Sequence, residues 1–285
     1  MKRVLLAGST GYLGSHIAKE LLKRSYFLRA VARNTERLRA KDIEPTEIVE
    51  AELTKAETMR GGCGNIDVVI STVGITKQKD GLTYMDVDYQ ANMNLLEEAK
   101  AGGVKMFIYV SVLNGENLRH LAICDAKEKF VEQLKKSGLR YCIVRPNGFF
   151  SDITEIYSMA KKGRVYLFGD GRWKANPIHG KDLAAVCVDA IDGPNQEIEV
   201  GGPETLTHNE MAQTAFDVLG TETKISYIPN WARMTIGKIL KIFTPSRTYG
   251  PMEFFLTVMS MDMIAPKYGK YTVKEYFTEL KRNGC

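Results

Sequence analysis

Short apolar runs alternate with segments of helical periodicity along the first half of the chain. The pattern predicts strands at 4–7, 27–32, 46–50, 68–70, 106–110 and 141–144, and helices at 12–23, 89–101 and about 126–136. Most strand segments are continuously apolar, which is typical of strands covered on both faces. Strands that alternate with helices predict a doubly wound parallel sheet of the α/β class (Rossmann), whose ligands lie beyond the carboxyl ends of the strands.

The alternation becomes less regular after residue 146. We therefore predict two domains, a sheet domain over residues 1–146 and a smaller, mostly helical lobe over residues 147–285. Within the lobe, residues 177–201 contain a helix near Lys181 and a strand that we expect to return to the sheet. Further along, the helical pattern is expected to break at Pro229, Pro245, Pro251 and Pro266.

A basic amphipathic segment, residues 231–243, lies between two of these prolines. Its apolar residues share one helical stripe, whereas Arg233, Lys238 and Lys241 fall outside that stripe. Such a helix is able to lie on an anionic membrane surface. Because the segment is short, we expect it instead to pack on the lobe and, with residues 254–256, to line an apolar cleft.

The turn after the first predicted strand carries Gly8, Gly11 and Gly14. In a dinucleotide-binding turn, the first glycine permits the sharp bend, the second lets the backbone approach the pyrophosphate, and the third packs the helix on the strand. The pyrophosphate then meets the N-terminus of the helix. Because this triplet stands between a predicted strand and a predicted helix, we predict a dinucleotide-binding domain. The expected contacts are Gly8, Ser9, Thr10, Gly11, Tyr12, Leu13 and Gly14.

The end of the second predicted strand bears on the choice of dinucleotide. An NAD site places a carboxylate there for the ribose 2′-hydroxyl, whereas this chain has Arg33. A guanidinium suits a 2′-phosphate, and Arg37 or Ser9 are candidates to assist. We therefore predict NADP(H) as the cofactor; the alternative is that Arg33 is a solvated surface residue.

Composition and charge exclude several other classes of function. The chain has 285 residues, 44% of them hydrophobic, and a formal net charge of +5 without a dense basic block, so no nucleic-acid partner is expected. Five cysteines without CxxC spacing are typical of reduced thiols in a cytoplasmic protein. We predict no metal, because no cluster of His, Cys, Asp and Glu has metal-ligand spacing. No apolar run is long enough to span a bilayer.

Several short motifs resemble the extended and atypical short-chain dehydrogenases/reductases. Within that group the chain is most similar to divinyl chlorophyllide vinyl-reductase-like and NmrA-like members, through motifs such as Asp88-Tyr89-Gln90-Ala91 and Phe168-Gly169-Asp170-Gly171. The resemblance implies catalytic positions at Ser111 and Lys127. It implies cofactor contacts at Glu52 and Leu53 (adenine), Ser71, Thr72, Val73 and Lys127 (ribose), Pro146 and Asn147 (beside the nicotinamide) and Phe149.

One position departs from the pattern of this family. Its usual acid is a tyrosine four residues before the lysine, and this chain has Ile123 there. Because isoleucine has no proton to donate, ketone reduction by a Tyr–Lys relay is not expected. Lys127 is still suited to bind ribose hydroxyls, unless it is a surface lysine. Cys124 and Asp125 are nearby alternatives as the acid.

These features favour one function and leave two others open. The leading hypothesis is an NADPH-dependent oxidoreductase that reduces a hydrophobic conjugated substrate, namely an enone, a quinone or a vinyl group. The second is a non-catalytic NADP(H)-binding regulator or assembly factor, as NmrA-like relatives are. The third, a sugar-nucleotide epimerase or dehydratase, is weakened by Ile123. The predicted partner is a small hydrophobic molecule; contact with a membrane surface is the less favoured alternative.

Overall fold

The computed structural model describes residues 1–76, 78, 81–229, 231–232, 235 and 246–284. The chain folds into two compact units. Unit 1 comprises Met1–Arg145 and Leu183–Ile198, and unit 2 comprises Pro146–Asp182 and Glu199–Cys285.

A seven-stranded sheet organises unit 1, in the order β3-β2-β1-β4-β5-β6-β9. Its strands are β1 (Arg3–Ala7), β2 (Phe27–Ala32), β3 (Glu47–Glu50), β4 (Val68–Ser71), β5 (Met106–Val110), β6 (Arg140–Pro146) and β9 (Gln196–Val200). The paired strands from β3 to β6 all run parallel. Strand order reverses about β1, which is the hallmark of a doubly wound sheet. The predicted fold class is therefore confirmed.

The register of β1 determines which segments meet at the carboxyl edge of the sheet. Ala7, the last residue of β1, pairs with Val31 of β2 and with Ser71 of β4. The glycine turn, the residues after β2 and the loop after β4 therefore leave the sheet at the same edge. This is the edge at which open α/β sheets bind ligands.

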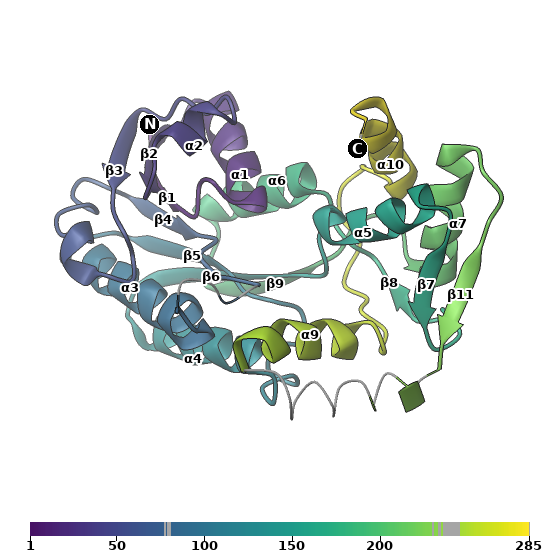
Figure 1. Cartoon of the computed structure of the whole chain (residues 1–285). Coiled ribbons are helices and arrows are strands. Elements are labelled where there is room, and N and C mark those ends of the chain that lie inside the picture. Colours follow the sequence, from purple (N-terminus) through teal and green to yellow (C-terminus); the bar gives the residue numbers. More distant parts are fainter. Residues whose placement is uncertain (77, 79–80, 230, 233–234, 236–245, 285) are drawn as a thin grey trace. The chain divides into compact units, whose positions relative to one another are not determined.

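Helices cover both faces of this sheet. Figure 1 shows α1 (Tyr12–Lys23) and α6 (Gly180–Asp189) on one face, and α3 (Ala91–Ala101) and α4 (Ala122–Lys136) on the other. The second face holds a large apolar core in which Phe107 and Tyr109 of β5 pack with Leu95 of α3 and Phe130 of α4. Shorter elements are α2 (Glu36–Arg39), η1 (Ala56–Met59), the π-helical η2 (Met85–Gln90) and η3 (Ala190–Asp192).

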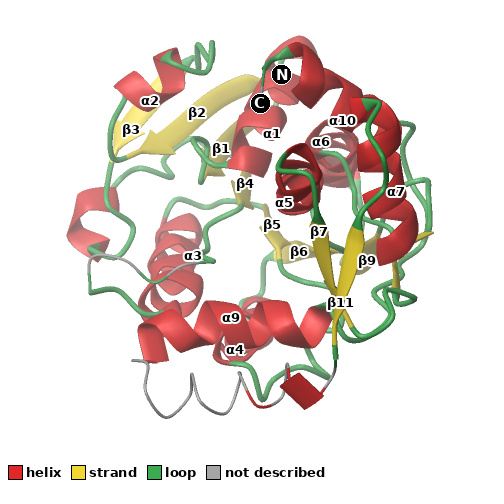
Figure 2. Ribbon diagram, turned by 45° about the vertical axis from the view of Figure 1, so that its right-hand side comes forward, coloured by secondary structure: helices red, strands yellow, loops and turns green. Residues whose placement is uncertain are grey.

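Unit 2 is built mainly from helices, shown in red in Figure 2. Its elements are α5 (Phe150–Lys161), β7 (Val165–Phe168), β8 (Lys174–Ala175), β10 (Leu206–Thr207), α7 (His208–Leu219), β11 (Ile225–Ile228), α9 (Ser246–Val258) and α10 (Val273–Arg282). Strand β7 pairs in parallel with β11, and β8 pairs antiparallel with β10. Helices α5, α7 and α10 enclose the core of this unit, which includes Tyr157, Phe216 and Phe277.

Several predicted boundaries differ from the structure. Helix α4 begins at Ala122, four residues earlier than predicted, so Ile123 lies inside its first turn. Pro251, expected to break a helix, lies within α9; the helix continues although proline lacks one amide donor. The predicted segment 231–243 falls almost entirely outside the described residues. Over the described part of the chain, no helix is both long and apolar enough to cross a membrane.

Candidate functional site

The glycine turn between β1 and α1 needs glycine at its first and third positions for different reasons. Gly8 has φ +82°, a left-handed conformation that favours glycine, and a Cβ there would overlap the hydroxyl of Thr72. A Cβ on Gly14 would overlap the carbonyl of Gly8, so this glycine allows α1 to pack against the turn. At Gly11 a Cβ would meet only the Gly8 carbonyl oxygen, at 3.2 Å. The middle glycine therefore leaves the backbone open to a ligand.

The N-terminus of α1 opens directly from this turn. Gly11 is the N-cap residue, and no side chain caps the helix there. The first N–H groups of a helix and its positive dipole end favour an anionic ligand. A cleared glycine turn leading into an N-terminus without a side-chain cap fits the pyrophosphate of a dinucleotide.

Hydroxyl groups fix this turn to the neighbouring strands. The buried Ser9 donates its Oγ hydrogen to the carbonyl of Val31 at 2.9 Å, and Thr72 donates to the carbonyl of Ala7 at 3.2 Å. Ser9 was predicted as a candidate to assist at a 2′-phosphate. Its hydroxyl hydrogen instead bonds the turn to β2. Leu13 is buried as well, so any contact it makes with a cofactor is through its backbone.

The residues predicted to meet the adenosine end lie after β2 and β3. Arg33 is exposed and follows β2 directly. Glu52 is paired with Lys55 at 2.7 Å, and this contact lowers the pKa of Glu52, to which the charge of Arg33 also contributes. The carbonyl of Leu53 accepts a hydrogen bond from the Asn94 amide at 2.8 Å. Arg33, Glu52 and Leu53 are thus brought to one corner of unit 1.

Lys41 is a basic residue of this region that the sequence analysis did not select. Its ammonium lies 3.4 Å from the carbonyl oxygen of Gly11. Burial and the neighbouring Lys19 lower the pKa of Lys41. Residues 33–41 contain several basic side chains, and only the folded structure shows which one lies beside the turn.

The loop after β4 is held by an asparagine that the sequence analysis also missed. Ser71 donates its hydroxyl hydrogen to the Asn92 side-chain oxygen at 2.6 Å, and the Asn92 amide donates to the carbonyl of Val73 at 3.2 Å. The backbone N–H of Val73 donates to the Ser71 hydroxyl. Asn92 of α3 therefore shapes the loop that was predicted to lie under the ribose.

Lys127, the predicted ribose-binding lysine, is not a surface residue. Its side chain is only 13% exposed, and its ammonium lies 2.9 Å from a carboxylate oxygen of Asp88, which is fully buried. A Cβ on Gly74 would lie 2.8 Å from this ammonium, so glycine in the loop after β4 makes room for it. Burial alone would lower the pKa of Lys127, but Asp88 raises it, so the lysine remains charged.

The residues just before Lys127 on α4 offer no ready proton donor. Ile123 is buried in the first turn of α4. Cys124 is buried too, and burial raises the pKa of its thiol to about 12. Partial burial alone would raise the pKa of Asp125, but ion pairs with Lys129 (2.7 Å) and Arg119 (3.2 Å) lower it. Neither alternative acid predicted from the sequence is therefore poised to protonate a substrate at neutral pH.

Ser111, the other predicted catalytic residue, lies at the end of β5 within a buried ion network. It donates its hydroxyl hydrogen to Glu128 at 3.2 Å. Glu128 forms a two-pronged pair with Arg145, at 2.6 and 2.9 Å, and Arg145 also donates to Glu197 at 2.8 Å. This network was not predicted, and it occupies the hydroxyl that the family resemblance assigns to catalysis.

Pro146, Asn147 and Phe149, predicted to contact the cofactor near the nicotinamide, belong to unit 2. The Asn147 amide donates to the Asn176 side-chain oxygen at 2.9 Å and to the carbonyl of Met263, and its own oxygen accepts from the backbone N–H of Gly148 at 2.7 Å. Asn147 therefore has a structural role within unit 2, and cofactor contact by these three residues stays a prediction.

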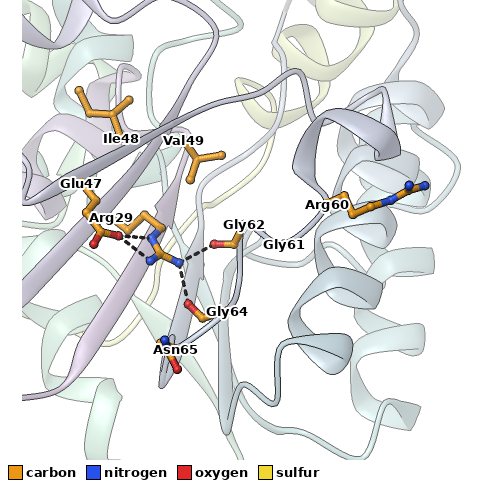
Figure 3. A pocket seen from close by; sticks show the side chains of 9 residues that line it. All are labelled: Arg29, Glu47, Ile48, Val49, Arg60, Gly61, Gly62, Gly64 and Asn65. Carbon is orange, nitrogen blue, oxygen red and sulfur yellow. Dashed lines mark hydrogen bonds and ion pairs between the residues drawn. The ribbon is translucent and has the colours of Figure 1, made fainter.

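A hollow of about 580 Å³ in unit 1 is separate from these residues (Figure 3). It surrounds Arg29 of β2, which pairs with Glu47 and donates to the carbonyls of Gly62 and Gly64 at 2.9 and 2.8 Å. Figure 3 shows this guanidinium pointing at both carbonyls, while Arg60 extends away. The hollow is lined by Arg29 of β2 and by Glu47, Ile48 and Val49 of β3, and contains no predicted site residue.

Metal and thiol chemistry find no support in the described part of the chain. No group of three or more His, Cys, Asp or Glu there has an arrangement that could hold a metal ion. Cys63, Cys124, Cys142 and Cys187 are buried free thiols. Burial raises the pKa of each, so these cysteines are inert as nucleophiles.

A glycine turn that opens into a helix at the carboxyl edge of a doubly wound sheet defines a dinucleotide-binding protein of the Rossmann class. The model of the NAD(P)H-binding family matches residues 8–194, more than half of the sequence. The chain belongs to this NAD(P)H-binding family and is oxidoreductase-like.

Relatives with known names include vinyl reductases and photosystem II assembly factors. The divinyl chlorophyllide a 8-vinyl-reductase of Arabidopsis thaliana is 29% identical to this chain, over 99% of this chain and 77% of its own length. The photosystem II assembly factor Ycf39 of Guillardia theta is 26% identical over 79% of this chain and 73% of its own length. The vinyl reductases match the resemblance stated from the motifs.

Solved structures show the same fold at low sequence identity. The NADPH-dependent quinone oxidoreductase of Escherichia coli, complexed with NADPH, superposes with a TM-score of 0.72 and 16% identity. The superposition covers 98% of this chain and 99% of that protein.

Proposed function

We propose that this protein is an NADPH-dependent reductase that acts on a carbon–carbon double bond of a hydrophobic conjugated substrate. The observation that carries the proposal is the combination of a retained, buried Lys127 with Ile123 four residues before it. The lysine that binds the cofactor in the family pattern is present, whereas the tyrosine that would protonate a carbonyl oxygen is replaced by isoleucine.

The preference for NADPH over NADH rests on two cations, one after β2 and one beside the glycine turn. Arg33 is exposed where an NAD site has a carboxylate, and Lys41 lies beside Gly11. A guanidinium and an ammonium both suit a phosphate, the first as a planar fork and the second as a point charge. Glu52, a carboxylate whose pKa the charge of Arg33 helps to lower, is already paired with Lys55.

The chemistry divides between the cofactor and the chain. A bound reduced nicotinamide supplies the hydride. The glycine turn and the start of α1 bind the pyrophosphate, and Lys127 donates to the ribose hydroxyls. Because Ile123 has no proton to give, the substrate itself must delocalise the charge that develops when the hydride reaches one carbon. The adjacent carbon then takes its proton from solvent. Hydride addition to an isolated ketone would instead create a localised alkoxide with no acid at position 123 to stabilise it.

The substrate that we favour is a vinyl group on a tetrapyrrole. Support comes from the vinyl reductases of plants, which align with 99% of this chain. An enone or a quinone is the alternative within the same chemistry.

Turnover assays test this proposal. Purified protein with NADPH is offered divinyl chlorophyllide, a quinone, a simple enone and an isolated ketone, and NADPH oxidation is followed by absorbance. We expect turnover with at least one conjugated substrate and none with the ketone. Lys127→Ala is expected to weaken NADPH binding as well as turnover. Fast ketone reduction that is unaffected by Lys127→Ala would contradict the proposal.

A second candidate function is a cofactor-binding assembly factor without turnover. It is supported by the Ycf39 relatives and by the absence of a proton donor at position 123. Tight NADPH binding with no turnover of any conjugated substrate would favour this candidate. A cytoplasmic location stays a prediction, because the plant vinyl reductases are named as chloroplastic.

A further inference from the structure

Asp88 is a fully buried carboxylate to which neither the motifs nor the proposed function assigns a role. It belongs to η2, the π-helical turn before α3. One of its oxygens, Oδ2, accepts a hydrogen bond from the backbone N–H of Ile75 at 3.3 Å. Among the described residues, the other oxygen, Oδ1, is reached only by the ammonium of Lys127, at 2.9 Å. A carboxylate is almost never buried completely unless it is paired.

The surroundings of this pair point towards the cofactor side of the sheet. Gly74, in the loop after β4, has no side chain where a Cβ would lie 2.5 Å from Asp88 Oδ1 and 2.8 Å from Lys127 Nζ. Ile75, which follows Gly74, holds the second Asp88 oxygen. The same loop contains Ser71, Thr72 and Val73, which were predicted to meet the ribose. The ion pair and the predicted ribose loop are therefore parts of one local structure.

The missing tyrosine changes what the charge of Lys127 can do. Beside a tyrosine, an ammonium favours the ionised phenol and so lowers its pKa. With Ile123 there, that position has no phenol. The phenol beside Lys127 is that of Tyr109, and burial raises its pKa to about 12 although Lys127 lowers it, so it stays protonated. The buried charge of Lys127 still costs desolvation energy, and the carboxylate of Asp88 at 2.9 Å offsets that cost.

We propose that Asp88 is a positioning residue that compensates the charge of Lys127 and aims its ammonium at the ribose hydroxyls of the bound dinucleotide. The pair then works as an electrically balanced hydrogen-bond donor instead of as half of a proton relay. This inference rests on the proposed function only in requiring that a dinucleotide binds; it does not require turnover.

The other titratable groups around the pair stay unchanged over the useful pH range. Burial raises the pKa of Tyr109 of β5, of Tyr84 before η2 and of Cys124 of α4 to about 12 each. Glu128 of α4 is held by Arg145 at 2.6 Å. Any pH dependence that a change at Asp88 creates between about pH 7 and pH 9.5 therefore reports on Lys127.

The test measures NADPH affinity of the full chain by fluorescence or calorimetry as a function of pH. In the native protein Asp88 raises the pKa of Lys127, so affinity is expected to be flat up to about pH 9.5. In Asp88→Asn burial persists without the carboxylate, which lowers the pKa of Lys127. Affinity should then be near native below that pKa and fall by about tenfold above it, because a charge-assisted donor is lost.

Asp86→Asn is the matched control. Asp86 lies in the same short helix, and its carboxylate accepts from the backbone N–H and hydroxyl of Thr83 at 2.8 and 2.6 Å. This variant should keep a flat pH profile of NADPH affinity. An Asp88→Asn protein whose affinity falls equally at every pH would overturn the proposal, because that result indicates a structural role alone.

A double-mutant cycle keeps the proposal testable if Asp88→Asn folds poorly. Lys127→Met is combined with Asp88→Asn, so that neither buried charge is left alone. If Asp88 acts through Lys127, adding Asp88→Asn to Lys127→Met changes NADPH affinity less than twofold. If Asp88→Asn lowers NADPH affinity as much in the Lys127→Met protein as in the native protein, the proposal is overturned. Failure of the native protein to bind any dinucleotide would instead contradict the proposed function itself.

Discussion

Two adjacent residues of α4, Lys127 and Glu128, enter buried ion clusters of different kinds. Among the described residues, Lys127 has one charged partner, Asp88, and it lies beside the loop after β4 where Gly74 leaves room. Glu128 has both oxygens bonded to Arg145, and one of them also accepts from Ser111. The first cluster keeps donor capacity for a ligand, whereas the second is satisfied internally.

This difference separates binding from support. A buried network with every member satisfied stiffens the structure around it. A buried pair next to a loop in which glycine leaves space is suited to bind a ligand, because the lysine can still donate hydrogen bonds. We therefore propose that the Lys127–Asp88 pair serves cofactor binding and that the Glu128–Arg145 network supports the fold.

Removal of Arg145 should produce the largest effect on stability. Arg145→Met leaves Glu128 buried without its cation, and breaking such a pair costs about 3–5 kcal/mol. Urea unfolding measures the loss. Arg140→Met, at the exposed start of the same strand, is the control and should cost less than about 1 kcal/mol. A small effect at Arg145 would show that the network does not support the fold.

Arg33 is the opposite case to Arg145, because it is an exposed cation at the carboxyl edge and is expected to serve binding and not stability. Arg33→Ala should leave stability unchanged and reduce the preference for NADPH over NADH by about ten- to a hundredfold, the worth of a charge-assisted contact with phosphate. Calorimetric titration with both cofactors measures this preference. Arg39→Ala, also exposed, is the control. An unchanged preference in Arg33→Ala would remove the argument for NADPH.

Lys127→Met should make stability depend on pH. Burial raises the pKa of Asp88, and Lys127 lowers it; without the lysine the pKa of Asp88 in the folded state rises further above its unfolded value. A raised pKa contributes stability that is present at low pH and lost as pH rises through the folded pKa. We expect Lys127→Met to be destabilised by about 1–3 kcal/mol at neutral pH, and much less near pH 4.

Thermal unfolding of Lys127→Met across this pH range tests the sign. Lys129→Met serves as the control, because Lys129 is half exposed and pairs with Asp125 on the surface of the same helix. Its effect should stay below about 0.5 kcal/mol at any pH. A loss of stability in Lys127→Met that grows towards acid pH would show that the sign is wrong.

Ser111→Ala should produce the smallest change. Its hydroxyl bonds Glu128, and loss of one such hydrogen bond costs about 1 kcal/mol. We expect turnover to change by less than about tenfold, since general acid–base or oxyanion roles are worth at least a hundredfold. A hundredfold loss of turnover at unchanged stability would return Ser111 to the catalytic role that its sequence position predicts.

Much of unit 1 follows from local sequence patterns. Strands β2 and β5 and helix α1 have the predicted bounds, because an apolar run or a helical stripe marks them without reference to the rest of the chain. The glycine turn was recognisable for the same reason, since its three glycines are close in sequence. The carboxyl edge then follows from the order of the strands.

The contacts that define the candidate site were not predictable in the same way. Asp88 and Lys127 are far apart in sequence and meet only because η2 and α4 lie on the same face of the sheet. In the same way, Asn92 contacts Val73 and Lys41 contacts Gly11, although each pair is well separated in sequence. Sequence spacing identified Lys127 as important, but its burial and its partner depend on tertiary packing.

The proposed function, reduction of a conjugated alkene by NADPH without a tyrosine relay, is tested by the transfer of deuterium. The protein is incubated with NADPH deuterated at C4 and with divinyl chlorophyllide or an isolated ketone, and the products are analysed by mass spectrometry. We expect one deuterium on carbon in the reduced vinyl group and none in the ketone. Deuterium in the ketone product, or tight NADPH binding with no deuterium in any conjugated substrate, would contradict it.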